Sequence, residues 1–392
     1  MKRVSEVLVT ILIVAITGCG GGKQTDPQSE GIITVDVTAS YPEKELVLQD
    51  FMNVEYIALE TTDEFVNQGR VLDVGKEFVL IGNNNARDGD IFVYDRNGKV
   101  LRKINRMGQA GEEYGFISGI ILDEDNNEMF VHDNISKKFV VYDLYGNFKR
   151  SYGFKDGIEH SNIFNYDTDK LICDDRRITT EEERSSESFY IISKQDGSVV
   201  NEIKVPFKQE KSSILMRKMG EMSVGVSFRH PSIMPYDGNY ILTSLSADTI
   251  FRYLPTNNNI EPFIVRTPSI QSMDPEVFLF PAMFTDQYYF VESAKKVFDI
   301  ESNTGFPRVK MVYDRQERKI YEYTISNADY SGRTETIAIK TINDEIAFCQ
   351  KMEPFELIEA NEQGKLKGKL KEVADGLDED DNPVIMLVKY KK

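Results

Sequence analysis

The sequence predicts an all-β protein: a six-bladed β-propeller of four-stranded antiparallel blades, with one short helix near the C-terminus. Three observations predict this fold. A strand–turn–strand unit recurs six times, a second pair of strands precedes each copy, and a helical apolar period is found only near the end of the chain. Four short strands in about 50 residues make one propeller blade, and six such units fill residues 32–392 as a single domain.

The repeated unit is clearest in two segments, Ile91–Ile104 and Phe139–Tyr152. Each begins as an apolar strand ending in Tyr-Asp, continues through two residues to a glycine, and enters a second strand. The glycines, Gly98 and Gly146, are 146 − 98 = 48 residues apart. Asp-x-x-Gly is typical of a tight hairpin, because glycine adopts the positive φ that other residues resist. Four weaker copies are Phe189–Lys204, Thr249–Val265, Val309–Tyr323 and Phe355–Gly364.

Each hairpin is preceded by another pair of strand-like segments separated by turn residues. The clearest pair lies within Phe116–Asp133. The other pairs are Arg70–Val74 with Phe78–Gly82, Ile163–Tyr166 with Leu171–Asp174, Ser232–Pro235 with Tyr240–Ser244, Phe284–Tyr289 with Phe290–Glu292, and Thr336–Lys340 with Ile346–Gln350.

The C-terminal region departs from this pattern. Apolar residues from Leu366 to Leu377 follow the spacing of one helix face, and Pro383 ends that helix. Two spare strands remain, Asn53–Leu59 before the first unit and Val384–Tyr390 at the end. Because an open ring leaves unpaired edges, we expect these terminal strands to meet in the closing blade.

Composition argues against several classes of protein. The chain has 392 residues and a formal net charge of −17, which disfavours nucleic acid because phosphate binding needs clustered cations. Three cysteines are too few for a disulfide-stapled fold, and three histidines leave little for a histidine metal site. No nucleophile elbow, Walker loop or zinc-protease motif occurs, so the sequence predicts no cofactor, no metal and no identifiable catalytic residue.

The N-terminus resembles that of a bacterial lipoprotein. Lys2 and Arg3 precede an apolar run, Val7–Ile16, which is shorter than the roughly 20 residues that span a membrane. The sequence Ile16–Cys19 then matches a lipobox, an aliphatic residue followed by small residues and a cysteine. An ordinary signal peptide that ends near a cysteine is the alternative.

The lipobox implies a location in the cell envelope. It makes residues 1–18 a signal peptide and Cys19 the lipidated first residue of the mature chain, which joins the protein to a membrane. Residues 19–31 are rich in glycine and polar residues and are expected to form a flexible tether. Gly20 is not an aspartate, so retention in an inner membrane is not signalled and the outer membrane is expected. The sequence leaves open whether the domain faces the periplasm or the outside.

Several motifs together resemble the six-bladed β-propeller lipoproteins of Bacteroidetes, whose blades are related to NHL repeats. They span nearly the whole mature chain, and in many members the second motif reads Gly-Gln-Gly-Pro-Gly-Glu-Tyr. The motifs are Val54–Thr62, Gly108–Tyr114 (here Gly-Gln-Ala-Gly-Glu-Glu-Tyr), Asp248–Tyr253 and Asp381–Leu387. The resemblance implies a fold and a location but carries little biochemistry.

The candidate ligand-binding residues are Arg229, His230 and His132. Arg229 and His230 come just before an inner strand of the fourth blade, where inner-strand ends surround the channel mouth, and could hold an anion there. A structural loop set by Pro231 is the alternative. His132 lies inside a predicted strand, where a packed, hydrogen-bonded histidine is the simpler interpretation.

Other polar features have structural explanations. The acidic run Asp123–Glu128 spaces oxygens like a Ca²⁺ loop but lacks its glycine, so a solvated hairpin is favoured, and Asp378–Asp381 is read as a loop ending the helix. His160 is expected to be exposed. Cys173 and Cys349 follow apolar residues and are expected to be buried free thiols.

The sequence therefore predicts a lipid-anchored binding or interaction module of the cell envelope, whose ligand is a glycan, a peptide or a partner envelope protein. A propeller enzyme, a lyase or hydrolase with a site at the channel rim, is the alternative. It requires His230, His132 and nearby carboxylates to converge. A scaffold that binds a partner on its outer blade faces is a third possibility.

Lipidation gives a first prediction. Cys19→Ser, or treatment with globomycin, is expected to block maturation, because the cysteine sulfur is the atom that carries the lipid. Detergent-phase partitioning of cell fractions measures this. The variant should leave the detergent phase, and an unchanged partition would refute lipidation.

Overall fold

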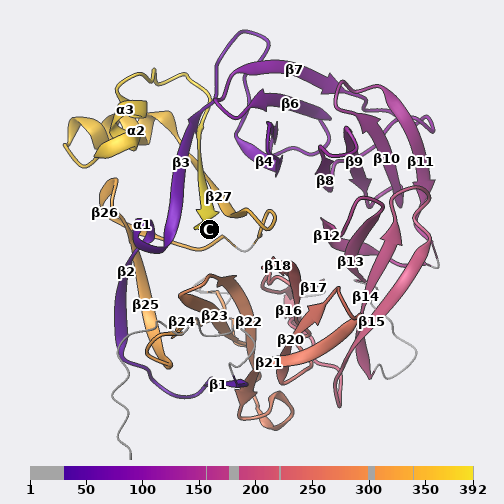
Figure 1. The fold of residues 1–392 in the computed structure, drawn as a ribbon, viewed down its shortest axis with the longest axis vertical. Coiled ribbons are helices and arrows are strands. Elements are labelled where there is room, and N and C mark those ends of the chain that lie inside the picture. The colour runs from indigo at the N-terminus through magenta and orange to yellow at the C-terminus, as the bar shows by residue number, and fades with distance from the viewer. Residues whose placement is uncertain are drawn as a thin grey trace, which may run out of the picture. The chain divides into compact units, whose positions relative to one another are not determined.

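The computed structural model describes residues 31–155, 157–175, 185–219, 222–298, 305–338 and 340–391. Within it, Ile32–Lys392 is one compact unit. This unit is a six-bladed β-propeller of mainly antiparallel four-stranded sheets, as predicted, and the first strand of each regular blade lies nearest the centre of the ring (Figure 1). The predicted signal peptide, Cys19 and the tether up to residue 30 lie outside the described residues.

The first three blades are antiparallel sheets of four strands that follow one another in chain order. Blade 1 comprises β4 (Arg70–Val74), β5 (Phe78–Gly82), β6 (Asp90–Asp95) and β7 (Val100–Asn105); blade 2 comprises β8 (Gly119–Asp123), β9 (Glu128–Asp133), β10 (Lys138–Asp143) and β11 (Phe148–Gly153); blade 3 comprises β12 (His160–Asn165), β13 (Lys170–Asp175), β14 (Ser186–Ser193) and β15 (Val199–Pro206). The predicted strand pairs and hairpins of these blades are confirmed.

The glycine of the repeated turn also sets the spacing between blades. Gly98, Gly146 and Gly197 have φ values of 81°, 85° and 73°. A Cβ at Gly98 would lie 2.0 Å from the carbonyl oxygen of Ala58, and one at Gly146 would lie 2.9 Å from Ile104. Each turn thus rests on the preceding blade, so the position requires glycine for both its backbone conformation and its closeness to a neighbour.

Blades 4 and 5 are also built from four consecutive strands. Blade 4 comprises β18 (Ile233–Tyr236), β19 (Asn239–Leu242), β20 (Thr249–Leu254) and β21 (Asn259–Thr267); blade 5 comprises β22 (Val277–Phe284), β23 (Tyr288–Lys295), β24 (Arg308–Asp314) and β25 (Lys319–Asn327). The expected break between Tyr289 and Phe290 is wrong, because both lie in β23. The turn falls earlier, at Thr285, whose amide donates to the carbonyl of Tyr288 over 2.8 Å.

Two N-terminal strands that the sequence did not predict extend these blades. The strand β1 (Ile33–Asp36) pairs in parallel with β21, and β2 (Glu43–Val47) pairs in parallel with β25. In β1 the side chains of Ile33 and Val35 are buried and that of Thr34 is exposed. The chain therefore covers the outer edges of two blades before it enters the ring, which leaves fewer backbone groups unpaired.

The closing blade joins the two ends of the domain. Strand β28 (Val384–Tyr390) lies between β27 (Ile346–Met352) and β3 (Met52–Ala58), which the short helix α1 (Leu48–Phe51) precedes. The register runs from Val384 opposite Ala58 to Tyr390 opposite Met52. In Figure 1 the indigo β3 accordingly lies beside the yellow C-terminal strands. The predicted closure by the terminal strands is confirmed.

The sixth predicted hairpin, Phe355–Gly364, is wrong, because this segment begins a pair of helices. Helix α2 (Pro354–Glu362) has proline in its first turn, and α3 (Gly368–Ala374) lies within the predicted helix. Leu357 and Ala360 of α2 and Leu370 and Ala374 of α3 pack into one cluster with β28. Of the apolar residues that suggested a strand, Leu357 lies on the buried helix face and Phe355 is exposed.

The expected strand Thr336–Lys340 is also not present as a strand. Strand β26 (Tyr330–Glu335) ends before it and pairs with β25. The described residues of the next segment are held beside β27 and β4 by side chains: Gln350 Nε2 donates to the Thr336 carbonyl (2.6 Å), and Asn343 Nδ2 donates to the Val74 carbonyl (2.9 Å). Blade 6 is therefore a three-stranded sheet with an irregular inner segment.

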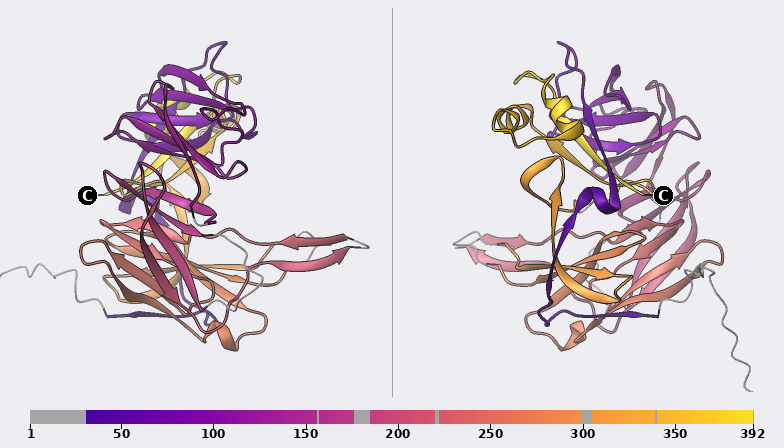
Figure 2. Two further views of the ribbon diagram at one scale, coloured as in Figure 1. Left: turned by 90° about the vertical axis from the view of Figure 1, so that its right-hand side faces the viewer. Right: turned by 60° about the vertical axis from the view of Figure 1, so that its left-hand side comes forward.

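A separate hairpin formed by β16 (Leu215–Met219) and β17 (Met222–Val226) precedes blade 4 and makes a two-stranded sheet of its own. Figure 2 shows it projecting away from the blades as a long arm.

The acidic run Asp123–Glu128 forms the expected turn between β8 and β9, but its first and last residues are buried rather than solvated. Its charges serve to join strands and blades: Asp123 and Lys194 form an ion pair of 2.7 Å in which both side chains are only 5% exposed. Glu128 pairs with Arg150 (2.7 Å) and Lys149 (2.6 Å). Within a buried setting, removing one partner of such a pair is costly because the other charge is left unpaired.

The closing strand gives the second prediction. Deleting residues 384–392 removes β28, leaves β27 and β3 without a shared partner, and is expected to abolish cooperative unfolding. Urea unfolding followed by circular dichroism measures this. Deleting only residues 391–392, which leaves β28 intact, is the control and should keep a single transition. A fully folded protein without residues 384–392 would contradict the closure.

Candidate functional site

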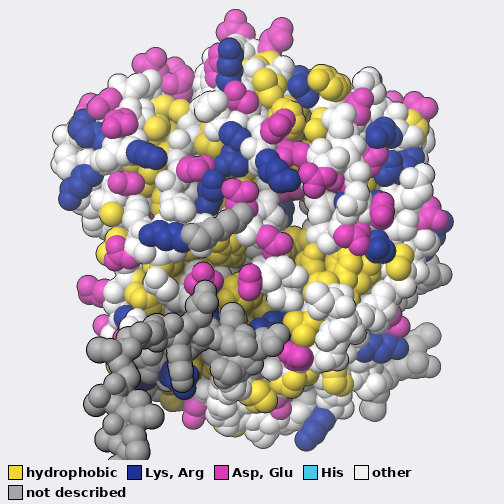
Figure 3. Space-filling view, viewed as in Figure 1, with side chains coloured by type: hydrophobic (Ala, Val, Ile, Leu, Met, Phe, Trp, Pro, Cys, Tyr) yellow, Lys and Arg dark blue, Asp and Glu magenta, His cyan; other side chains and the backbone are white. Residues whose placement is uncertain are grey.

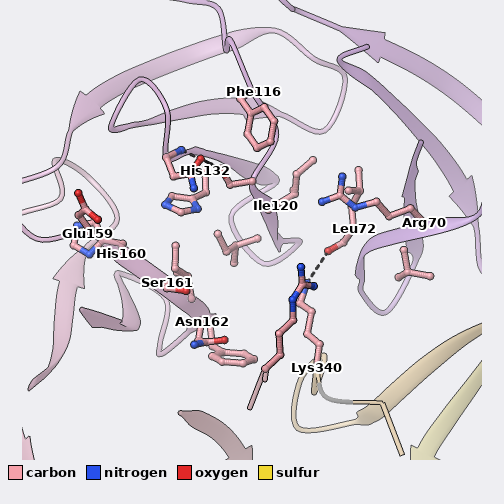
Figure 4. A pocket seen from close by; sticks show the side chains of 18 of the residues that line it. Arg70, Leu72, Phe116, Ile120, His132, Glu159, His160, Ser161, Asn162 and Lys340 are labelled. Carbon is pink, nitrogen blue, oxygen red and sulfur yellow. Dashed lines mark hydrogen bonds between the residues drawn. The ribbon is translucent and has the colours of Figure 1, made fainter. Parts of the chain in front are cut away.

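A cavity of about 750 Å³ lies where the inner strands of several blades begin. Its walls come from the start of β4, from the starts of β8 and β12, from the segment before β18, and from Lys340 ahead of β27 (Figure 4). Inner strands of a propeller begin at the same end of the ring, so residues far apart in sequence meet there. The volume is in the range of small-molecule sites.

All three predicted site residues, His132, Arg229 and His230, line this cavity. The cavity also contains His160, so the chain's three histidines share one site. The ring of His230 packs near Phe228 (6.1 Å between centroids) and Phe280 (6.0 Å), and its Nδ1 lies 3.3 Å from the carbonyl oxygen of Pro231.

His132 is a buried, neutral imidazole. Its ring stacks on Phe154 at 5.3 Å with an interplanar angle of 19°, and it packs against Phe139 at 5.3 Å. Burial lowers the pKa of His132 to about 4, with His160 adding to the effect and Asp133 opposing it. The residue is 6% exposed, and its Nε2 is a buried atom with no hydrogen-bond partner among the described residues. An unsatisfied buried nitrogen facing a cavity can bind a ligand atom.

His160 is buried rather than exposed, which corrects the sequence expectation. It is the first residue of β12, and the aromatic rings of Phe139 and Phe154 on blade 2 cover it at 5.7 Å and 4.8 Å. Its Nδ1 lies 3.2 Å from the sulfur of Cys173. Burial raises the pKa of Cys173 well above its ordinary value and that of Cys349 to about 12. Both cysteines are free thiols, and Cys173 is buried while Cys349 is partly exposed.

Three cations line another part of the cavity: Arg70, Arg229 and Lys340. Burial lowers the pKa of Arg70, and the nearby Arg229 lowers it further by repulsion, while Asp88 opposes the change. Lys340 donates from Nζ to the carbonyl of Leu72 over 3.2 Å (Figure 4). In the part of the chain that the structure describes, no carboxylate lies within ion-pair distance of these three side chains.

The opposite wall is polar and mostly neutral. Ser118 donates to Asn134 over 2.5 Å, and Asn162 donates to Asp174 over 2.7 Å. Glu159 is the one acidic residue that lines the described cavity, and its carboxylate lies 2.9 Å from Lys137 Nζ. The wall therefore offers hydroxyl and amide groups, and its single carboxylate is paired with a lysine.

A second cavity, of about 420 Å³, lies at the other end of the inner strands. Its lining includes Asp237, Asp286 and Asp344, each in the turn that follows the innermost segment of a blade, together with Lys391. The two ends of the inner strands thus carry opposite charge.

The described residues contain no group of three or more His, Cys, Asp or Glu placed to hold a metal ion.

The sequence matches the family described as domain of unknown function DUF4934, over residues 32–389. The chain belongs to this family. The match covers the whole propeller and stops just short of the end of β28, so the DUF4934 domain and the closed ring are the same unit. A comparison with curated proteins finds no match.

Two of the solved structures similar to this DUF4934 protein come from Bacteroides. An exported protein of Bacteroides fragilis is similar over 92% of this chain and 100% of its own, with a TM-score of 0.60 at 15% identity. A member of the DUF4221 family from Bacteroides vulgatus covers 88% of this chain and 99% of its own, with a TM-score of 0.48 at 11% identity. At such identities the first likeness supports the fold alone.

Among the described helices, none is long and apolar enough to cross a membrane.

Proposed function

We propose that this DUF4934 protein is a binding module of the cell envelope that holds its ligand in the cavity at the starts of the inner strands. The ligand is a glycan, a peptide or a segment of an envelope protein, and it is bound without making or breaking a bond. The observation that carries the proposal is the convergence of polar side chains from four blades and the Lys340 segment on one cavity of about 750 Å³.

The rigidity of the walls supports a binding role. The inner strands are tied to the rest of their blades by regular antiparallel ladders, and blades 2 and 3 are joined by the buried pair of Asp123 and Lys194. A preformed site loses little conformational entropy when a ligand enters, so more of the contact energy appears as affinity.

Attachment to a membrane completes the proposed role. In this proposal the lipobox Ile16–Cys19 supplies a lipid anchor at Cys19, and residues 19–31 tether the propeller to the outer membrane as a lipoprotein. A tether of this length holds the domain roughly 20 Å from the lipid, by the scaling of flexible chains. The acidic and basic side chains are interspersed on the face shown in Figure 3, as suits a soluble domain beside a membrane.

An enzyme, a lyase or hydrolase, is the second candidate, and one observation favours it. His132, His160, His230 and Glu159 all line the cavity, as a channel-rim active site requires. His132, however, is neutral and buried, and Glu159 is paired with Lys137, so these two described residues do not form an acid and base pair across a substrate position.

Cavity filling tests the proposal. Gly119 lines the cavity, and a Cβ there would meet no atom within 4 Å, so Gly119→Trp is expected to fold and to occupy the site. Gly111→Trp is the matched control, because Gly111 is equally open but lies outside the cavity. The readouts are a glycan array and pull-down from the native envelope, with the mature full-length protein.

The wild type and Gly111→Trp should capture the same ligand, and Gly119→Trp should lose at least about 90% of it, because an indole at the start of β8 competes with the ligand for space in the pocket. Equal capture by Gly119→Trp would move binding to the outer faces of the blades. If the captured glycan has a different mass after contact with the protein than before, the enzymatic role would replace the binding role.

A further inference from the structure

We infer that the cavity binds a carboxylate-bearing, hydroxyl-rich ligand of the chemical class of the sugar acids. The inference rests on the proposed binding function and names the ligand chemistry of the same site. It depends on three features of the cavity: a cationic wall, a buried nitrogen without a partner, and a facing wall of neutral polar groups.

The cationic wall stands out against the charge of the whole molecule. The chain has a net charge of −17, yet Arg70, Arg229 and Lys340 gather around one cavity. Placing like charges together is unfavourable unless something offsets them. Burial lowers the pKa of Arg70, and repulsion from Arg229 adds to the effect.

The described residues compensate these cations only from a distance. Asp88 attracts Arg70, and the buried Asp73 attracts Lys340, in neither case with a hydrogen bond or ion pair between them. Glu159, the acid that lines the cavity, is paired with Lys137. Guanidinium groups bind carboxylates with two parallel hydrogen bonds, so two arginines beside a lysine form a suitable receptor for a carboxylate.

The buried nitrogen of His132 adds a second point of recognition. Its Nε2 has no hydrogen-bond partner among the described residues, and only 6% of the residue's surface is exposed. Figure 4 shows the imidazole directed into the cavity, across from Arg70 and Lys340. A neutral imidazole nitrogen pairs with a hydroxyl rather than with a second charge, so it fits an uncharged part of the ligand.

The facing wall fits further hydroxyl groups. Ser118, Ser161, Asn134 and Asn162 line it and present hydroxyl and amide groups, which both donate and accept hydrogen bonds. Phe116 adds an aromatic surface at the edge of the cavity (Figure 4). A ligand that bears one carboxylate and several hydroxyls matches both walls at once.

The charge at the far end of the inner strands agrees with this assignment. The second cavity is lined by Asp237, Asp286 and Asp344 and by one lysine, Lys391. The lining of the first cavity, with three cations and one acid, therefore suits an anion better than that of the second, with three acids and one lysine.

Calorimetric titration of the mature full-length protein tests the inference. The probes are galacturonate, glucuronate and trigalacturonate, and their neutral counterparts are galactose, glucose and the methyl ester of trigalacturonate. At least one acid should bind more than tenfold more tightly than its neutral counterpart, and raising the salt concentration should weaken it. The inference would be overturned if none of the three acids bound more tightly than its neutral counterpart.

Two variants connect binding to the named groups. Arg70→Gln removes one charge and should weaken the acid at least about tenfold, whereas Lys369→Gln, which changes an exposed residue of α3 and the net charge equally, should not. His132→Phe keeps the ring packing but removes Nε2, and should weaken the acid and the neutral sugar alike.

The outcomes also separate this inference from the proposed function. A neutral sugar that binds the wild type as tightly as its acid does, but does not bind Gly119→Trp, would leave the binding function standing and overturn the acid specificity. Acid binding that Arg70→Gln does not change would overturn the assigned contact. Envelope capture that Gly119→Trp leaves intact would overturn both proposals.

Discussion

The structure depends on the closure of the ring by its last strand. Strand β28 pairs with β27 on one side and β3 on the other, and its residues Val384–Val388 are fully buried. Without it, blades 1 and 5 would have no common neighbour, and the edges of β27 and β3 would be open to water or to other chains. The cavity depends on the same closure, because its walls come from blade 1 and from the inner segment of the closing blade, which holds Lys340.

Much of the fold could be predicted because each blade repeats a local signal. The turns require glycine at Gly98 and Gly146 for two reasons, the positive φ and the close contact with the preceding blade. Glycine therefore occurs at matching positions in the two repeats. The last unit could not be predicted in the same way. Phe355–Gly364 has apolar residues that suit either a strand or a helix, and only packing against β28 decides for the helix. The parallel strands β1 and β2 depend on partners more than 200 residues away, which no local pattern indicates.

The site could be predicted in part, for a related reason. Arg229 and His230 precede an inner strand, a position that a repeat analysis assigns to the channel mouth, and both line the cavity. Arg70 occupies the corresponding position in blade 1, at the start of β4, so the same rule could have found it. His160 could not be placed, because its burial comes from aromatic residues of another blade. Lys340 lies in a segment without regular pairing, so its approach to Leu72 is visible only in three dimensions.

Native-state hydrogen exchange tests the closure most directly. In a ring closed by its terminal strands, the amides of Ile385–Val388 in β28 exchange only by global unfolding. Their opening free energy should therefore equal that of Phe130 and Val131 in β9, which lies in a blade remote from the closure. Added denaturant should lower the two values in parallel. Opening of β28 at a free energy several kcal/mol lower, while β9 stays protected, would contradict the account.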